Sequence, residues 1–363
     1  MCTRSLLPTL LGLSLALGAC DNDPTQPNAS PAPSGPELAV AFGSWITRAN
    51  MPVNRQDPAI ATVTNGGGQS VVYVIGGVNP GMGPTRSLMA YNVATNTWTF
   101  RRQLPVPLGG TNGAAVINGK IYVSGGYSDY TENFPSKRLY MYDPGTNTWT
   151  RKSDMPETTV DDGNNRLWVG GHGATGVIDG KLYVVTPCAQ SNEPWGIYEG
   201  CGGHPAPWFF RYNPVTNRWT TLRSPFVNAT DPPLSPYMGG VVGGKLYVMT
   251  GNRSVGRLAA YDPATNQWTS RTPLGLGRPG AATAVLGGKL YVMGGKRWNA
   301  ALQTYETLDI TIVYDPATDA WTRRASLPSA RDQIAASKVF LNGGSRIELV
   351  GGTLPGNNLQ YVP

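Results

Sequence analysis

The sequence predicts an all-β protein built from repeated antiparallel sheets. A short apolar strand followed by glycines recurs along the chain, most clearly as KLYVMGG at residues 289–295. Each copy is followed by a polar loop, a strand that ends in tyrosine, a turn and a tryptophan. The tyrosine and the tryptophan are seven residues apart in five copies: Tyr91/Trp98, Tyr142/Trp149, Tyr212/Trp219, Tyr261/Trp268 and Tyr314/Trp321. A period of about 50 residues is typical of propeller blades or stacked arrays.

Each unit is expected to form four antiparallel strands. The first is built from Ala and Gly, as in AATAV at 281–285, which fits the crowded centre of a radial array. Gly287-Gly288 then forms the tight hairpin turn, where positive φ is needed. The apolar run 290–293 reads as a buried strand. The turn DPAT at 315–318 has proline in its preferred second position and leads to the outer strand, which carries Trp321.

These features resemble the kelch repeat, with its di-glycine, its tyrosine and its spaced tryptophan. The resemblance covers residues 44–363 and implies a β-propeller. The third and fourth units depart from it, because Thr186-Pro187 and Thr250-Gly251 replace the di-glycine. We therefore expect those two blades to pack less regularly than the others.

The two ends of the repeat region determine the number of blades. The last unit, residues 347–362, stops before any tryptophan strand, whereas Ser44–Arg48 form an isolated strand containing Trp45 before the first unit. We expect the isolated strand to complete the last sheet. The prediction is a six-bladed kelch-type β-propeller closed by an N-terminal outer strand, an arrangement that leaves only short, protected edges.

Residues 1–20 have the features of a bacterial lipoprotein signal peptide. Arg4 gives a positively charged N-terminal region, and the apolar stretch Leu6–Leu17 is too short to span a membrane. Residues 17–20, LGAC, resemble the lipobox, in which Cys20 would be lipidated; the alternative is an ordinary secretory signal. Residues 21–43 are rich in Pro, Asn, Asp and Ser and are expected to be a flexible tether. The expected location is extracytoplasmic, with a lipid anchor in a bacterial membrane, at the periplasmic face or the cell surface.

The formal charge is moderately basic, with 29 Lys and Arg against 22 Asp and Glu. Basic residues recur three positions after most of the tryptophans: Arg48, Arg101, Lys152, Arg271 and Arg324. On outermost strands they would discourage edge-to-edge pairing; the alternative is a belt that binds glycans or lipids. A secreted protein is not expected to bind nucleic acid.

Cys188 and Cys201 lie in one long loop, and a disulfide between them is expected because an extracytoplasmic compartment permits it. The alternative is a metal site with His204. Catalytic metals typically have three protein ligands, and the sequence contains no HxH or HxxxH pair. We therefore expect neither a metal nor a cofactor.

The connections on one face of the predicted propeller are short, and those on the opposite face vary widely in length. Because variable loops on a scaffold usually carry function, the long-loop face around the channel mouth is the candidate binding surface. Several polar and aromatic loop residues, Asp57 and Asp332 among them, fall on this face. The ligand-binding candidates are Arg55, His172, Trp195, Trp208, Tyr237, Arg278 and Arg331.

The expected function is a monomeric, membrane-anchored binding or scaffold module for an envelope protein or glycan. Arginine binds carboxylates through two parallel hydrogen bonds, so Arg278 and Arg331 favour an acidic partner. The alternative is a sugar-modifying enzyme at the channel mouth, such as a mutarotase or epimerase, by resemblance to a six-bladed kelch mutarotase. Arg278, Arg331 and Asp332 would supply its arginines and carboxylate. Copper oxidases on kelch propellers use a Tyr–Cys crosslink, which a Cys188–Cys201 disulfide would prevent.

Overall fold

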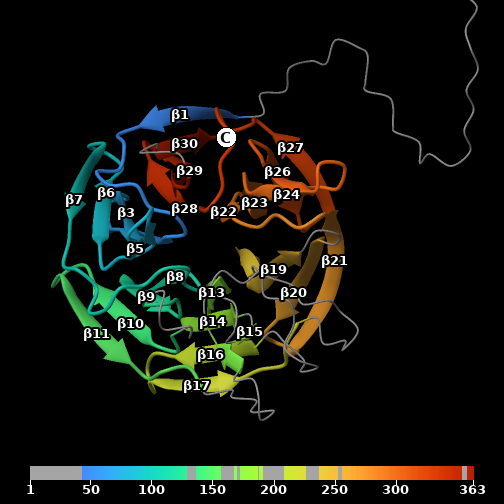
Figure 1. Cartoon of the computed structure of the whole chain (residues 1–363). Helices are drawn as coiled ribbons and strands as arrows, with labels where there is room; N and C mark the ends of the chain where they lie inside the picture. Colours follow the sequence, from blue (N-terminus) through green and yellow to red (C-terminus); the bar gives the residue numbers. More distant parts are fainter. Residues whose placement is uncertain are drawn as a thin grey trace, which may run out of the picture. The chain divides into compact units, whose positions relative to one another are not determined.

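Six four-stranded antiparallel sheets surround a central channel (Figure 1). The computed structural model describes residues 43–128, 136–156, 167–169, 172–186, 188–190, 208–225, 237–251, 256–353 and 358–363. No helix among these residues is long and apolar enough to cross a membrane. The predicted signal peptide and almost all of the predicted tether lie outside the described residues.

In blades 1 to 5 the chain begins at the channel and runs outward strand by strand. Blade 1 comprises β2 (Ala59–Thr64), β3 (Ser70–Ile75), β6 (Leu88–Asn92) and β7 (Thr97–Phe100), and blade 2 comprises β8 (Ala114–Ile117), β9 (Lys120–Ser124), β10 (Leu139–Asp143) and β11 (Thr148–Lys152). Blade 3 comprises β13 (Ala174–Ile178), β14 (Lys181–Thr186), β16 (Trp208–Asn213) and β17 (Arg218–Thr221), and blade 4 comprises β18 (Tyr237–Val242), β19 (Lys245–Gly251), β20 (Gly256–Asp262) and β21 (Gln267–Gly275). Blade 5 comprises β22 (Ala282–Leu286), β23 (Lys289–Met293), β26 (Thr311–Asp315) and β27 (Ala320–Arg324).

Blade 6 is built from both ends of the ring. Strands β28 (Ile334–Leu341), β29 (Gly344–Gly351) and β30 (Asn358–Val362) come from the end of the chain, and β1 (Ser44–Arg48) completes the sheet as its outermost strand. Trp45 lies opposite Tyr361 in the antiparallel register. The predicted fold is therefore confirmed: an all-β, six-bladed propeller closed by its N-terminal strand.

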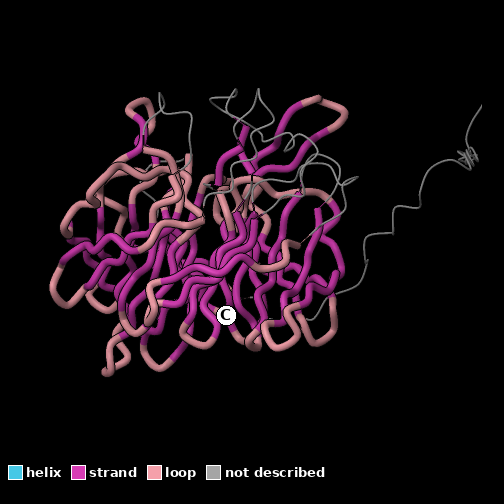
Figure 2. The backbone as a smooth tube through the Cα atoms, turned by 90° about the horizontal axis from the view of Figure 1, so that it is seen from below, coloured by secondary structure: helices cyan, strands magenta, loops and turns pink. Residues whose placement is uncertain are grey.

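Three short two-stranded sheets add to the blades in the described part of the chain. Two are hairpins, β4 (Val78–Asn79) with β5 (Gly83–Pro84) and β24 (Lys296–Asn299) with β25 (Thr304–Thr307); the third pairs β12 (Leu167–Val169) with β15 (Cys188–Gln190), which come from separate connections on either side of β13 and β14. They belong to the connections that were predicted to be long. The side view shows the longer connections on one face of the propeller and the short turns on the other (Figure 2). The longer connections therefore surround one end of the channel.

The repeated tyrosine and tryptophan join neighbouring blades. Each tryptophan indole donates a hydrogen bond to a backbone carbonyl where the chain leaves the preceding blade, as Trp149 Nε1 does to Arg102 O at 2.8 Å. In blades 1 to 4 the tyrosine hydroxyl donates to an asparagine in the turn, as Tyr142 does to Asn147 at 2.7 Å, and in blade 5 it donates to Asp319. Asn147 also accepts from the Arg102 backbone N–H. The same indole bond occurs at all six interfaces, from Trp45, Trp98, Trp149, Trp219, Trp268 and Trp321. The motif thus acts as an inter-blade clip.

The innermost strands are crowded, as their Ala and Gly content predicts. A Cβ added to Gly176 would come within 2.5 Å of Val241 on the next blade, and one added to Gly240 would come within 2.7 Å of Val285. Such distances cannot be accommodated unless the neighbouring valine side chain or its strand moves. Small residues therefore let six strands approach one another around the channel.

Blade 4 shows how the loss of the di-glycine changes a blade. Strand β19 continues through Thr250 to Gly251, which pairs with Gly256. The pairing of β20 with β21 then shifts register between Gly256 and Leu258. Pro187, the corresponding substitution in blade 3, lies outside the described residues.

Candidate functional site at the channel mouth

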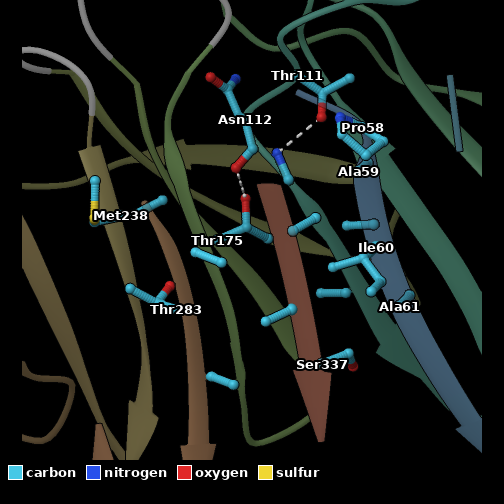
Figure 3. A pocket seen from close by; sticks show the side chains of 18 of the residues that line it. Pro58, Ala59, Ile60, Ala61, Thr111, Asn112, Thr175, Met238, Thr283 and Ser337 are labelled. Carbon is cyan, nitrogen blue, oxygen red and sulfur yellow. Dashed lines mark hydrogen bonds between the residues drawn. The ribbon is translucent and has the colours of Figure 1, made fainter. Parts of the chain in front are cut away.

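The channel holds a cavity of about 470 Å³, lined by the innermost strands of all six blades (Figure 3). Most of its walls are alanine, glycine and small hydroxyl side chains. The hydroxyls bridge adjacent blades: Thr175 Oγ1 donates to Asn112 O at 2.8 Å, and Thr283 Oγ1 donates to Gly239 O at 2.9 Å. Among the described residues that line the cavity, the ionisable side chains are Asp57, His172 and Lys338. Asp57 and His172 come from the connections that lead into blades 1 and 3.

A ring of residues with left-handed backbone surrounds the mouth. Just before the innermost strands of five blades, φ is 46° at Asp57, 51° at Gly110, 55° at His172, 71° at Gly280 and 56° at Gln333. Backbone N–H groups link these residues from blade to blade. Asp57 N donates to Gln333 O at 2.9 Å, Gln333 N to Gly280 O at 2.8 Å, and His172 N to Gly110 O at 2.8 Å. The five residues therefore hold structurally equivalent positions.

Glycine occupies this position in blades 2 and 5, where positive φ causes little strain. Blades 1, 3 and 6 instead have Asp57, His172 and Gln333, for which a left-handed backbone is less favourable in free energy than it is for glycine. Strained backbone of this kind is concentrated at functional sites. We define the mouth cluster as Asp57, His172 and Gln333.

The mouth cluster is held by specific contacts. Gln333 Nε2 donates to Asp57 Oδ2 at 3.0 Å. The His172 ring packs over Gly110, since a Cβ there would lie 2.6 Å from His172 Nε2 and 2.8 Å from the ring of Tyr127. Gly110 is therefore required for His172 to occupy this place.

Asp57 is the electrostatic centre of the mouth cluster. The channel leaves this side chain partly exposed, but protein occupies most of the space around it. This loss of bulk water is the main cause of the raised pKa of its carboxyl, and the nearby Asp332 carboxylate raises the pKa further. His172, the Gln333 hydrogen bond and Lys296 act in the opposite direction without cancelling the effect of burial.

Two of the arginines predicted from the sequence to bind a ligand are buried. Arg331 is 1% exposed, and its guanidinium donates to Ser329 Oγ at 2.6 Å. Arg55 is 5% exposed and donates to Ser87 Oγ at 3.0 Å. Burial lowers the pKa of both side chains. Both guanidinium groups are thus withdrawn from the channel by local contacts.

Arg278 keeps part of its side chain at the surface, beside the di-glycine of blade 5, where Nη1 lies 3.4 Å from Gly294 O. Burial lowers its pKa to about 10, with smaller contributions from Arg297 and Arg323. The residue remains cationic at neutral pH.

Asp332, the carboxylate that the enzyme alternative required, is 1% exposed. Its Oδ2 forms an ion pair with Lys296 Nζ at 2.8 Å, and its Oδ1 accepts a hydrogen bond from Thr353 Oγ1 at 3.1 Å. The carboxylate that reaches the cavity is instead that of Asp57.

The remaining candidates are only partly described. Trp208 begins β16 and packs, half-buried, against the core shared by blades 2 and 3. Tyr237 begins β18, where its backbone pairs with Thr250. Trp195 lies outside the described residues. The predicted disulfide also cannot be placed, because Cys201 is not described. Nowhere in the described chain do three His, Cys, Asp or Glu side chains gather closely enough to hold a metal.

Gln333 was not selected from the sequence, although an internal repeat could have revealed it. The segments RQDPA at 55–59, RPGAA at 278–282 and RDQIA at 331–335 share an arginine and, four residues later, an alanine. Aligning them places Gln333 with Asp57 and Gly280, as the structure does.

The comparisons with known proteins agree with this architecture. A family model described as "Kelch motif" matches residues 66–105, 111–156 and 277–328, which belong to blades 1, 2 and 5. The chain is a six-bladed β-propeller with kelch motifs in blades 1, 2 and 5. This propeller is 29% identical to the Kelch-like protein terF of Aspergillus terreus, over 99% of this chain and 73% of that protein. It is also 26% identical to human Kelch-like protein 38, over 49% of this chain and 25% of that protein.

Two further likenesses concern the fold. Beta-scruin of Limulus polyphemus is 25% identical over 78% of this chain and 29% of its own length. A solved structure titled "Structure of YjhT" superposes with a TM-score of 0.63, covering 85% of this propeller's chain and 94% of the other, at 17% identity. At that identity the superposition shows a shared fold only.

Proposed function

We propose that this kelch propeller is a binding or scaffold module, anchored outside the cytoplasm of a bacterium, whose long-loop face holds an envelope protein or glycan. Kelch propellers are typically protein-binding modules. The observation that carries the proposal is the mouth cluster. Three polar side chains stand where neighbouring blades have glycine, at the open end of a cavity of about 470 Å³. Ligand sites of about 300–1,000 Å³ are common in proteins.

An acidic group on the ligand would meet Arg278, which keeps part of its side chain at the surface. Burial and the like charges of Arg297 and Arg323 disfavour its charged form. A carboxylate or phosphate placed there would offset that repulsion. Arg278 is therefore the arginine through which we propose that an acidic partner is recognised.

The binding face can be tested with the immobilised propeller, an envelope extract and a glycan array. We expect His172→Ala to weaken capture of the recovered ligand by about 2 kcal/mol, the threshold for an interface anchor. Thr146→Ala, on an exposed turn of the opposite face, should leave affinity unchanged. If the Thr146 variant lost binding and the His172 variant did not, the binding site would lie on the short-turn face, and the proposal would be wrong.

The membrane anchor has its own prediction. If Cys20 is lipidated, Cys20→Ser should move the protein from the membrane fraction to the soluble fraction while the propeller stays folded. Metabolic labelling with a palmitate analogue should mark the wild type alone. A variant that remains in the membrane, together with an unlabelled wild type, would contradict the anchor.

A second candidate function is a sugar-modifying enzyme such as a mutarotase or epimerase. One observation favours it: Asp57 and His172 place a carboxyl and an imidazole at one cavity mouth. Such groups can act as general acid and general base when their pKa values are suitably shifted. Faster interconversion of a sugar's anomers by the wild type than by Asp57→Asn, measured by NMR, would support this function.

A further inference from the structure

The Asp57 carboxylate has no cationic partner among the described residues. Its one hydrogen bond from a side chain comes from the neutral amide of Gln333. Lys296, which attracts it electrostatically, forms its ion pair with Asp332 instead, at 2.8 Å. His172 attracts the carboxylate but forms neither a hydrogen bond nor an ion pair with it.

The two arginines that flank the mouth in sequence cannot supply the missing charge. Arg55 directs Nε to Ser87 and Nη1 to the Asn54 carbonyl, at 3.0 and 2.6 Å. Arg331 directs its guanidinium to Ser329. These contacts hold both cations in the blades.

Asp57 is also fixed in place. Its backbone N–H is bonded to Gln333 O, and the preceding residue, Gln56, exchanges two backbone hydrogen bonds with Val78, at 3.0 and 2.8 Å. These bonds fix the Asp57 backbone at the channel mouth, so the side chain starts from a defined position beside Gln333. Surrounding a carboxylate with protein costs free energy unless a cation or several donors compensate it.

We propose that the channel mouth binds a primary ammonium group, with the Asp57 carboxylate as its direct partner. An ammonium carries three donors; one would go to Asp57, and the Gln333 side-chain oxygen is a second acceptor in the mouth cluster. The cavity below, walled mostly by alanine, glycine and small hydroxyl residues, would hold the body of the ligand. This inference rests on the proposed function, since it gives the class of ligand taken by the same site.

The ammonium could belong to an amino sugar or to a lysine side chain, and the probes separate these sources. Binding to the wild-type propeller would be measured by calorimetry or ligand-observed NMR for two pairs. The first pair is glucosamine and N-acetylglucosamine, and the second is Nα-acetyl-lysine amide and its Nε-acetylated form. At least one free amine should bind at least tenfold more tightly than its acetylated twin.

The substitutions at Asp57 are chosen by side-chain size and by the residue that other blades have at the equivalent position. Asp57→Asn keeps the size of the side chain, and Asp57→Gly introduces the residue that blades 2 and 5 already have at this position, so both should fold. Each should bind the preferred amine at least tenfold more weakly. Asp143→Asn, which removes a carboxylate from the opposite face where it pairs with Lys120, should bind as the wild type does.

Affinity for the amine should rise with pH as Asp57 loses its proton, until the amine itself deprotonates. Equal binding of free and acetylated probes, undetectable binding of both amines at millimolar concentration, or unchanged binding by both Asp57 variants would each overturn the inference. The proposed function would survive that failure if His172→Ala still weakened capture of the envelope ligand. If His172→Ala had no effect either, the mouth itself would be excluded.

Discussion

Deleting strand β1 is expected to lower the free energy of unfolding by about 3–5 kcal/mol, the range typical for losing a packed tryptophan. Trp45 stacks against Tyr361 with ring centroids 5.2 Å apart, and its indole donates to the Ala325 carbonyl of blade 5 at 3.0 Å. The deletion also removes the backbone pairing with β30 and uncovers Tyr361, which is 1% exposed in the intact ring. No covalent connection compensates, because this is the point where the ring is closed by two ends of the chain.

The test compares two truncated proteins. One begins at Gly43 and keeps every strand of the ring, whereas the other begins at Ala49 and lacks β1. For a propeller of this length, the expected loss corresponds to a decrease in Tm of about 4–8 °C. Trp45→Ala in the longer protein would measure how much of the lost stability comes from the Trp45 side chain alone. Adding a peptide of residues 43–50 should restore part of the lost stability, and equal Tm values for the two proteins would contradict the closure.

The blades could be predicted from the sequence because their signals are local and repeated. The seven-residue spacing of Tyr142 and Trp149 places both on adjacent strands, and the same pattern in five units made the sixth recognisable. The inter-blade clip was less apparent. Asn147 reads simply as a turn residue, and only the structure shows that it accepts hydrogen bonds from Tyr142 and from the preceding blade.

The site could be predicted only in part, because its residues meet across blades that are distant in sequence. The long-loop face and His172 were inferred from connection lengths. The direction of a loop side chain depends on contacts that spacing does not encode. Arg331 looked accessible, yet its guanidinium is bonded to Ser329 two residues earlier, whereas the left-handed backbone at Asp57 and Gln333 brings those side chains together.

Glu348 should make the propeller less stable as pH rises from about 4.5 to about 7. This β29 residue is fully buried in blade 6 and accepts a hydrogen bond from Gln360 Nε2 at 2.8 Å, while its other oxygen has no partner. Arg48 and Arg346 attract the carboxylate, but Arg48 is bonded to Tyr91 and Arg346 to Gln360. Burial therefore dominates and raises the pKa to about 7 from the ordinary 4.5.

The direction of the effect follows from proton linkage. Below about pH 4.5 the carboxyl is protonated in both the folded and the unfolded state and contributes no penalty. Between about pH 4.5 and 7 the unfolded chain ionises while the folded chain retains its proton, so the free energy of unfolding falls. A shift of this size corresponds to about 3 kcal/mol, reached above pH 7.

Glu348→Gln should remove this dependence, because the amide cannot ionise and can keep the bond to Gln360. Urea unfolding should give the variant nearly wild-type stability at pH 4.5 and about 3 kcal/mol more than the wild type at pH 8. Glu306→Gln changes a half-exposed carboxyl whose pKa is lowered by Asn299 and Arg297, and it should leave the pH profile between 4.5 and 7 unchanged. The same difference between Glu348→Gln and wild type at both pH values would show that Glu348 is not the titrating group.

In the protein that lacks β1, the attraction of Arg48 is lost. If the Glu348 carboxyl stays buried there, its pKa should rise further and the loss of stability should extend above pH 7.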